Sequence, residues 1–326
     1  MTGTFKANNP LNTFLLFVYG LVLKMGWFLS PQISTIQKSD GFLFNDILGF
    51  VKPFMDHYPI SYSIITYLLL FSQAISLNHF MMRRRSLIKP NYLPAMSYLL
   101  ITSFFLEWNV LSAPLLINTL LIWVWGKMTN LYNNKHVQSS LFNIGMVVAI
   151  CSFLYFPSIA FLILILFSLL ITRAFKASEW IIAIMGIAVT WYFLFAWYFL
   201  RDKIYSFSLP GFKISFPIFA QNNEGYAAMI FLLVIAFIGG FFVQSNSGKQ
   251  IVQVRKSWSL MLLYFIVTLI IPFISLSNNF EYWILATVPA AAFISAVFFY
   301  PNKKYVVIIL QWLMVGFVIY MQYFKK

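Results

Sequence analysis

The chain has 326 residues, of which 61% are hydrophobic and only 9% are charged. A soluble globular domain carries about 25% charged residues, so a water-soluble protein of this composition would expose large apolar patches. The net charge of +14 would suggest nucleic-acid binding in a soluble protein, but here the basic residues lie between apolar runs, where topology and lipid headgroups account for them. Composition therefore predicts one integral membrane domain over residues 1–326, with membrane lipids as partners and no nucleic acid.

Apolar runs suited to transmembrane helices follow one another along the chain. A spanning helix needs about 20 mainly apolar residues. The first run is not followed by a cleavage site of the Ala-x-Ala type, so it is expected to be a retained anchor. The pattern predicts an all-α transmembrane bundle with about eleven spans, at 11–29, 59–79, 92–106, 110–126, 141–155, 157–173, 180–200, 226–244, 258–276, 281–299 and 304–323.

Two apolar stretches are too long for one helix, or contain a break, and are predicted to be helical hairpins. The stretch 92–126 contains the polar apex Glu107-Trp108-Asn109. The stretch 141–173 contains Pro157, and the residue before a proline is pushed out of the α region. Each of these positions is expected to be a tight turn.

The distribution of charge between the runs predicts an orientation. With a cytoplasmic N-terminus, the inner segments hold 14 of the 22 basic residues and, of the acids, only Glu179. Lys and Arg in short loops set the orientation of membrane proteins. The sequence therefore predicts a multi-pass protein of the inner (cytoplasmic) membrane, with the N-terminus inside and the C-terminus outside.

Two outer loops are long enough to carry structure. Residues 42–55 predict an amphipathic helix in the headgroup region that packs against the bundle, because polar and apolar residues separate onto two faces. The polar face is Asn45, Gly49, Lys52 and Asp56, and the apolar face is Phe44, Ile47, Leu48, Val51 and Met55. Residues 204–217 predict a small hairpin that turns at Pro210-Gly211 and docks on the bundle or on lipid.

Several polar residues interrupt the apolar runs. Lys24 is expected to extend its ammonium to the membrane interface, since a charge near the bilayer centre would cost at least about 2.5 kcal/mol and would indicate function. Gln73, Asn78 and Asn118 are expected to form hydrogen bonds between helices. Pro289 predicts a kink or, as an alternative, a broken helix at a binding site.

The densest basic cluster, Arg83-Arg84-Arg85, is expected to fix topology and to bind anionic lipid headgroups. No sequence motif for a phosphate loop, a metalloprotease or a nucleophilic hydrolase is present. The single cysteine, Cys151, lies in an apolar run, and the three histidines, His57, His79 and His136, are assigned to opposite sides of the membrane. The expected cofactor set is therefore none, and the expected metal set is also none.

Short motifs resemble an uncharacterised polytopic inner-membrane family of Bacteroidota. They are Asn9-Pro10-Leu11-Asn12, Gln73-Ala74-Ile75-Ser76-Leu77-Asn78, Lys89-Pro90-Asn91-Tyr92-Leu93-Pro94-Ala95 and Arg173-Ala174-Phe175 with Glu179-Trp180. The resemblance implies a domain of unknown function over most of the chain. Some members of that family carry a carotene-oxygenase label, which the sequence argues against because such enzymes resemble soluble propellers with a four-histidine iron site.

A looser resemblance is to membrane glycosyltransferases that use polyprenyl-linked sugars, which carry an acidic residue and interfacial helices in the first outer loop. Asp40 and Asp46 occupy comparable positions, and the resemblance implies that a carboxylate there acts as a base or holds a metal. The chain departs from that pattern because its first loop is short and it has no large outer domain.

Three functional hypotheses follow from the sequence. The favoured one is a binding or assembly component of the cell envelope, with another inner-membrane protein as its partner. The second is an envelope enzyme that transfers lipid-linked sugars, with Asp40 or Asp46 as the catalytic acid and with Arg201 and Lys203 binding the phosphate of a polyprenyl-linked lipid. The third is a carrier for lipid or a small apolar solute, with a polar path along Gln73, Asn78 and Asn118.

Overall fold

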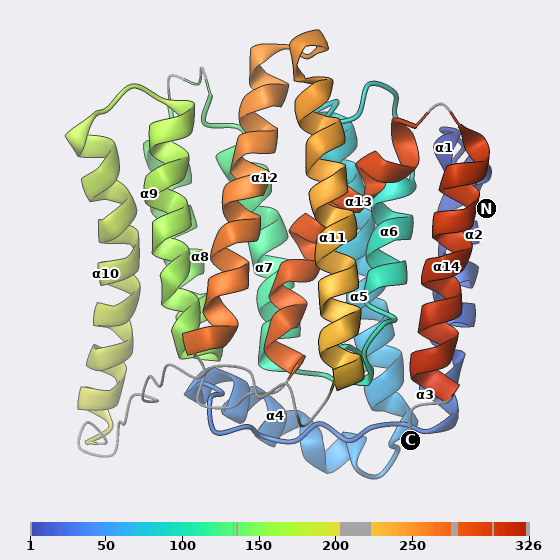
Figure 1. Cartoon of the computed structure of the whole chain (residues 1–326). Helices are drawn as coiled ribbons and strands as arrows, with labels where there is room; N and C mark the ends of the chain where they lie inside the picture. Colours follow the sequence, from blue (N-terminus) through green and yellow to red (C-terminus); the bar gives the residue numbers. More distant parts are fainter. Residues whose placement is uncertain are drawn as a thin grey trace.

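A computed structural model of the chain describes residues 2–132, 134, 136–202, 223–274, 280–301 and 303–323. The long helices lie side by side as a bundle, and α4 lies across one end of it (Figure 1). The helices are α1 (Thr2–Lys6), α2 (Leu11–Leu23), α3 (Met25–Leu29), α4 (Phe42–Met55), α5 (Ile60–Arg83), α6 (Leu93–Ile101), α7 (Ala113–Met128), α8 (Gln138–Leu154), α9 (Phe161–Thr172), α10 (Ala177–Leu200), α11 (Asn223–Ser245), α12 (Val252–Ile270), α13 (Thr287–Phe299) and α14 (Lys304–Tyr323).

Short 3₁₀ segments join several of these helices, and they include η1 (Leu106–Asn109), η2 (Phe156–Ala160), η5 (Ser247–Lys249), η6 (Ile271–Ile274) and η7 (Phe280–Ala286). In the described part of the chain, extended pairing is limited to one isolated bridge, between Asp40 and Tyr155. The all-α class predicted from the sequence is therefore confirmed.

Each predicted transmembrane segment overlaps a helix of the structure. Of the described helical segments, six are long and apolar enough to cross a membrane. These are Ile60–Arg83, Ala177–Leu200, Glu224–Ser245, Val252–Ile274, Phe280–Phe299 and Tyr305–Gln322. The remaining apolar helices are shorter, so the count of about eleven spans stays a prediction. The hairpin predicted at 204–217 lies outside the described residues.

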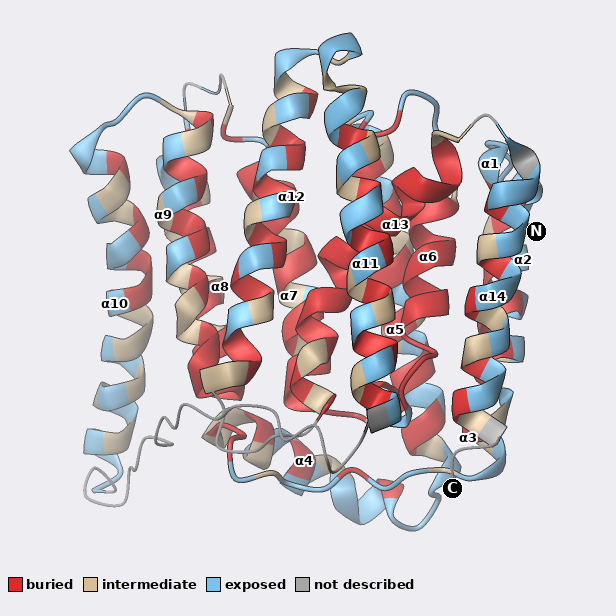
Figure 2. Ribbon diagram, in the orientation of Figure 1, coloured by how far each residue is buried: buried red, intermediate tan, exposed pale blue. Residues whose placement is uncertain are grey.

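Helices α6 and α13 form the centre of the bundle, and every residue of both is buried (Figure 2). Helix α6 has nine residues and ends at Ile101, well before the end predicted near residue 106. Pro289 lies in the first turn of α13, where a missing N–H costs no helical hydrogen bond. The backbone of the predicted span 281–299 changes from 3₁₀ to α geometry two residues before Pro289, and the predicted kink or binding site there stays a prediction.

Glycines allow the closest helix crossings. A Cβ atom on Gly186 of α10 would collide with the Phe142 carbonyl oxygen of α8, and one on Gly145 of α8 would collide with the Ala183 carbonyl oxygen. Similarly, a Cβ on Gly239 of α11 would collide with a backbone oxygen of α13. Small residues at such crossings let helix backbones approach closely, which is how helices associate when lipid removes the hydrophobic driving force.

The outer flanks of the bundle are apolar and exposed, most visibly on α10 and α14 (Figure 2). Only 17% of the most apolar window of α10 is buried inside the protein. An apolar surface of this extent is typical of contact with lipid acyl chains. The helices thus fit an integral membrane protein.

The connections fall at two ends of the bundle (Figure 1). Helix α1 and the connections α5–α6, α9–α10 and α11–α12 lie at the upper end, whereas α4 and the C-terminal end of α14 lie at the lower end. The upper end carries the basic residues that the sequence assigned to the inner segments, including Arg83, Arg173 and Lys249. We call these the basic end and the opposite end.

The glycine crossing of α8 and α10 generates a stability prediction. We expect Gly186→Leu to lower the free energy of unfolding by about 2 kcal/mol or more, because the added side chain forces two packed helices apart. Gly316→Leu on α14 is the matched control, since no atom lies within 4 Å of a Cβ built there. Thermal melting of the two purified variants in one detergent checks this, and equal melting temperatures would contradict it.

Candidate functional site

The carboxyl group of Asp40 is the most unusual polar group at the opposite end. Asp40 precedes α4 and is only 4% exposed. Its Oδ2 accepts a hydrogen bond from the Gln37 backbone N–H at 2.8 Å, and its buried Oδ1 has no hydrogen-bond partner among the described residues. Burial raises the pKa of this carboxyl from its ordinary value of 3.8 to about 6.

Backbone contacts hold Asp40 in this position. The N–H of Gly41 donates to the carbonyl oxygen of Leu154 at 2.7 Å, at the end of α8. Gly41 has an ordinary negative φ, so its conformation does not require glycine. Glycine is needed there because a Cβ atom would collide with the Phe153 carbonyl oxygen. The chain therefore enters α4 pressed against the end of α8, and that contact withdraws Asp40 from solvent.

Glu281 lies near Asp40 and also near a third acid, Glu107. Glu281, the second residue of η7, is close enough to interact electrostatically with both Asp40 and Glu107. The Nε1–H of Trp108 donates to the Phe280 carbonyl oxygen at 2.8 Å, which fixes η1 against η7. A desolvated carboxyl that exchanges a proton near neutral pH can act as a general acid or base.

The other residues predicted for a sugar-transfer site at the outer face are not buried with Asp40. Asp46 is exposed on α4, and it interacts electrostatically with Tyr198 near the end of α10. The guanidinium of Arg201 is exposed and lies over the Trp197 ring, 4.2 Å from its centroid. Lys203 lies outside the described residues. The structure thus brings the start of α4 beside the end of α10 and buries Asp40, while Asp46 and Arg201 stay on the surface.

Lys24 does not reach the surface, so the interfacial position expected from the sequence is wrong. The residue is 1% exposed and separates α2 from α3. Its ammonium donates to Asn109 Oδ1 at 2.7 Å and to Thr102 Oγ1 at 3.1 Å, and it lies 4.7 Å from the Trp27 ring centroid. Because α6 ends early, the segment after it supplies polar groups that surround the ammonium inside the bundle.

The polar residues expected along the helices occupy two different environments. Gln73 joins three helices: its Nε2 donates to the Leu115 carbonyl oxygen of α7 at 2.8 Å, and its Oε1 accepts from the hydroxyl of Tyr98 on α6. Asn118 of α7 donates to the Ile284 carbonyl oxygen at 2.8 Å. Asn78 instead approaches Met82 of its own helix. A polar path through all three residues stays a prediction.

The sequence did not single out Tyr98 or the pairing of Glu281 with Asp40. A tyrosine inside a predicted buried helix carries a weak signal, because its hydroxyl needs a partner there. The approach of Glu281 to Asp40 joins positions 241 residues apart (281 minus 40), and no local pattern encodes it. The cluster Arg83, Arg84 and Arg85 lies at the C-terminal end of α5, at the basic end, where Arg84 is half-buried and the other two are exposed.

The buried carboxyl generates a pH prediction. Because the folded state holds the Asp40 proton more tightly than the unfolded chain, this group contributes about 3 kcal/mol of stability below pH 4, which is lost as the pH rises through about 6. We expect Asp40→Asn to remove this dependence, so the variant gains stability relative to the wild type between pH 4.5 and pH 7.5. The measurement is thermal melting across that pH range.

The control is Asp46→Asn, which removes the same charge from the exposed side of α4. Its melting temperature relative to the wild type should stay constant over the same range. A constant difference for Asp40→Asn as well would show that the Asp40 carboxyl is not desolvated in solution.

Comparison with known proteins gives one match. A model described as a family of unknown function (DUF6427) matches residues 47–326. No curated protein and no solved structure matches the chain. The expected membership of a domain family of unknown function is thereby confirmed, whereas the Bacteroidota origin and the likeness to polyprenyl-dependent glycosyltransferases stay predictions. With its match spanning most of the chain, the protein belongs to the DUF6427 family of unknown function.

Proposed function

We propose that the protein is a multi-pass protein of the cytoplasmic membrane, with about eleven traverses and a cytoplasmic N-terminus, that serves as a binding or assembly component of the cell envelope. The observation that carries this proposal is the outward face of α4. That helix presents large aromatic side chains to solvent although its other face is already packed on the bundle.

Helix α4 is fixed from its inner side. Phe44, Leu48 and Met55 are buried, as the amphipathic pattern predicted, whereas Ile47 is partly exposed at the edge of that face. Beyond the end of the helix, the hydroxyl of Tyr62 donates to Asp56 Oδ1 at 2.7 Å. The helix is therefore held against the bundle on one side, and its exposed side is available for contact with a partner.

That remaining face combines apolar and charged groups. Phe50 and Phe54 lie one turn apart and are 89% and 70% exposed, and the exposed charges Asp46 and Lys52 flank them. Helix α4 crosses the end of the bundle rather than its flank (Figure 1), so in the proposed topology the face turned away from the bundle points out of the apolar layer. Aromatic anchors with a charged rim are typical of protein interfaces. The partner proposed here is an envelope protein with an apolar pocket for two rings.

Site-directed photocrosslinking in intact cells tests this function. A photoreactive phenylalanine analogue at Phe50 or Phe54 should give one discrete protein adduct of the same mass at both positions. The matched control is Phe241 on α11, which is 71% exposed on the apolar flank and should crosslink to lipid only. Lipid adducts alone at Phe50 and Phe54, or the same protein adduct at Phe241, would contradict the proposal.

The proposed orientation has a separate test. Cys151 is buried, so it can be replaced by alanine and single cysteines placed at Gly49 and Gly248, where a Cβ meets no atom within 4 Å. We expect a membrane-impermeant maleimide to label Gly49→Cys in intact spheroplasts and to label Gly248→Cys only after permeabilisation. The reverse pattern would invert the topology.

The buried carboxyl of Asp40 favours one second candidate, an envelope enzyme acting at the outer face on a lipid-linked sugar. In this alternative Asp40 exchanges the proton and Arg201 binds phosphate. It predicts that Asp40→Asn abolishes transfer of a sugar from a polyprenyl-phosphate donor in reconstituted vesicles, while Asp46→Asn keeps it. Full transfer by Asp40→Asn would remove this candidate.

A further inference from the structure

An open pocket of about 740 Å³ lies at the basic end, away from α4 and from the Asp40 carboxyl. It is surrounded by the C-terminal end of α9, the N-terminal end of α10, the segment after α7 and the first turns of α12. Its lining combines three cations with apolar and hydroxyl-bearing groups: Tyr132, Asn134, Leu170, Ile171, Thr172, Arg173, Ala174, Lys176 and Lys256.

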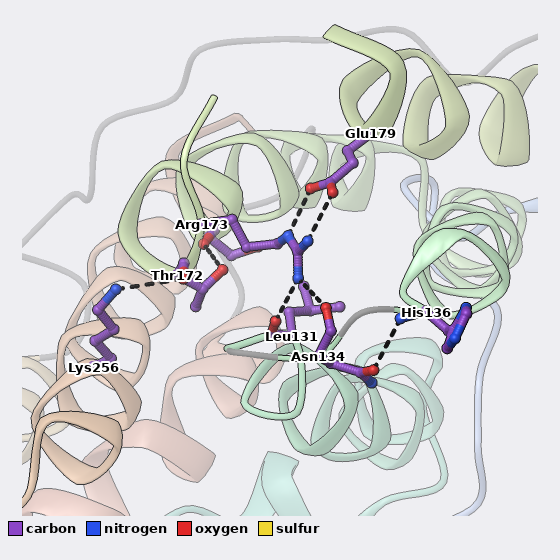
Figure 3. A network of polar contacts seen from close by, with 8 residues as sticks. Leu131, Asn134, His136, Thr172, Arg173, Glu179 and Lys256 are labelled. Carbon is purple, nitrogen blue, oxygen red and sulfur yellow. Dashed lines mark hydrogen bonds and ion pairs between the residues drawn. The ribbon is translucent and has the colours of Figure 1, made fainter. Parts of the chain in front are cut away.

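Arg173 shapes this pocket, and its guanidinium donates four hydrogen bonds to neighbouring residues (Figure 3). Its Nε and Nη2 donate to the two carboxylate oxygens of Glu179 at 2.8 and 2.9 Å. Its Nη1 donates to the carbonyl oxygens of Leu131 and Asn134 at 2.9 and 2.6 Å. Arg173 therefore ties the segment after α7 to the start of α10, and Glu179 balances its charge.

The two lysines supply the uncompensated charge. The Lys256 ammonium lies 4.4 Å from the Tyr132 ring centroid, and its one hydrogen bond in the described structure is a long contact of 3.3 Å to the Thr172 carbonyl oxygen. Lys176 is exposed at the start of α10. An ammonium has three donors, so both side chains keep N–H groups for an anionic ligand. The Arg173–Glu179 pair is neutral, which leaves the pocket with a charge of +2 from Lys176 and Lys256.

One side of the pocket is continuous with the lipid-facing flank. Leu170 lines the pocket and is exposed, and it lies on the same face of α9 as the exposed residues Ile163 and Phe167. The spacing of three and four residues makes these three side chains one apolar stripe along the helix. A ligand with a charged head and an apolar tail can thus place its head beside the lysines and its tail along α9.

We propose that this pocket binds a phosphate group, and specifically the phosphodiester headgroup of an anionic phospholipid. Basic pockets between helix ends on the cytoplasmic side hold lipid headgroups in this way. Arg173 acts as a positioning residue, Lys176 and Lys256 bind the phosphate oxygens, and the α9 stripe selects a lipid over a free anion. The proposal is independent of the α4 surface.

The test uses the full-length protein, delipidated in detergent and titrated with phosphatidylglycerol or phosphatidylcholine, with bound lipid counted by native mass spectrometry. We expect the wild type to prefer phosphatidylglycerol and the double variant Lys176→Gln/Lys256→Gln to weaken that binding on the order of ten-fold, given the contribution of each lysine near an anionic headgroup. The matched control, Lys249→Gln/Arg255→Gln, removes the same charge at the same end outside the pocket and should bind like the wild type.

Two further measurements make the result decisive. Lys176→Glu reverses an exposed charge without disturbing a packed group, so it should weaken phosphatidylglycerol binding even if the double variant folds poorly. Inorganic phosphate is titrated in a thermal-shift assay in parallel. Stabilisation of the wild type but not of Lys176→Glu by phosphate, without a lipid preference, would assign the pocket to a soluble phosphate. The proposal would be overturned if the pocket variants bound phosphatidylglycerol and inorganic phosphate as well as the control variant does.

Discussion

Inside a bilayer, backbone carbonyl groups that leave a helix must find partners within the protein, and this constraint acts at the centre of the structure. Helix α6 stops at Ile101, and η7 runs as a 3₁₀ segment into α13. Three side chains supply the donors for the carbonyl oxygens exposed there. Asn109 bonds Thr102 and Phe105, Trp108 bonds Phe280, and Asn118 bonds Ile284. The irregular backbone is therefore paired, and the two fully buried helices remain packed together.

The same irregularity determines where charge can be buried. The ammonium of Lys24 is tolerated because the segment after α6 presents Thr102 and Asn109 to it. At the opposite end, the junction of η1 and η7 places Glu281 near Glu107 and near Asp40. Burying such groups costs free energy unless partners compensate. Asp40 keeps an oxygen without a partner in the described structure, so its carboxyl can still accept a hydrogen bond or a proton at that end.

The sequence predicted what depends on local pattern. Apolar runs located the helices, the Pro157 break separated α8 from α9, and the two-faced pattern of 42–55 identified the buried side of α4. It failed where the outcome depends on contacts distant in sequence. Residues 102–105 contain no helix breaker, so the early end of α6 follows from bonds made by Asn109 and from the packing of α13. Lys24 was misplaced for the same reason, because its partners lie 78 and 85 residues away.

These contacts also indicate where activity should be sought. At the centre, Gln73 and Tyr98 join α5, α6 and α7, and Asn118 joins α7 to η7, so a solute passing between them would have to break these hydrogen bonds. At the two ends, the groups with unused contact or bonding capacity are an Asp40 oxygen and the α4 aromatics on one side, and the lysines of the Arg173 pocket on the other. A centre joined by interhelical hydrogen bonds, with such groups at both ends, supports the proposal that the protein holds partners and lipids at its two surfaces, and a polar path through the centre stays a prediction.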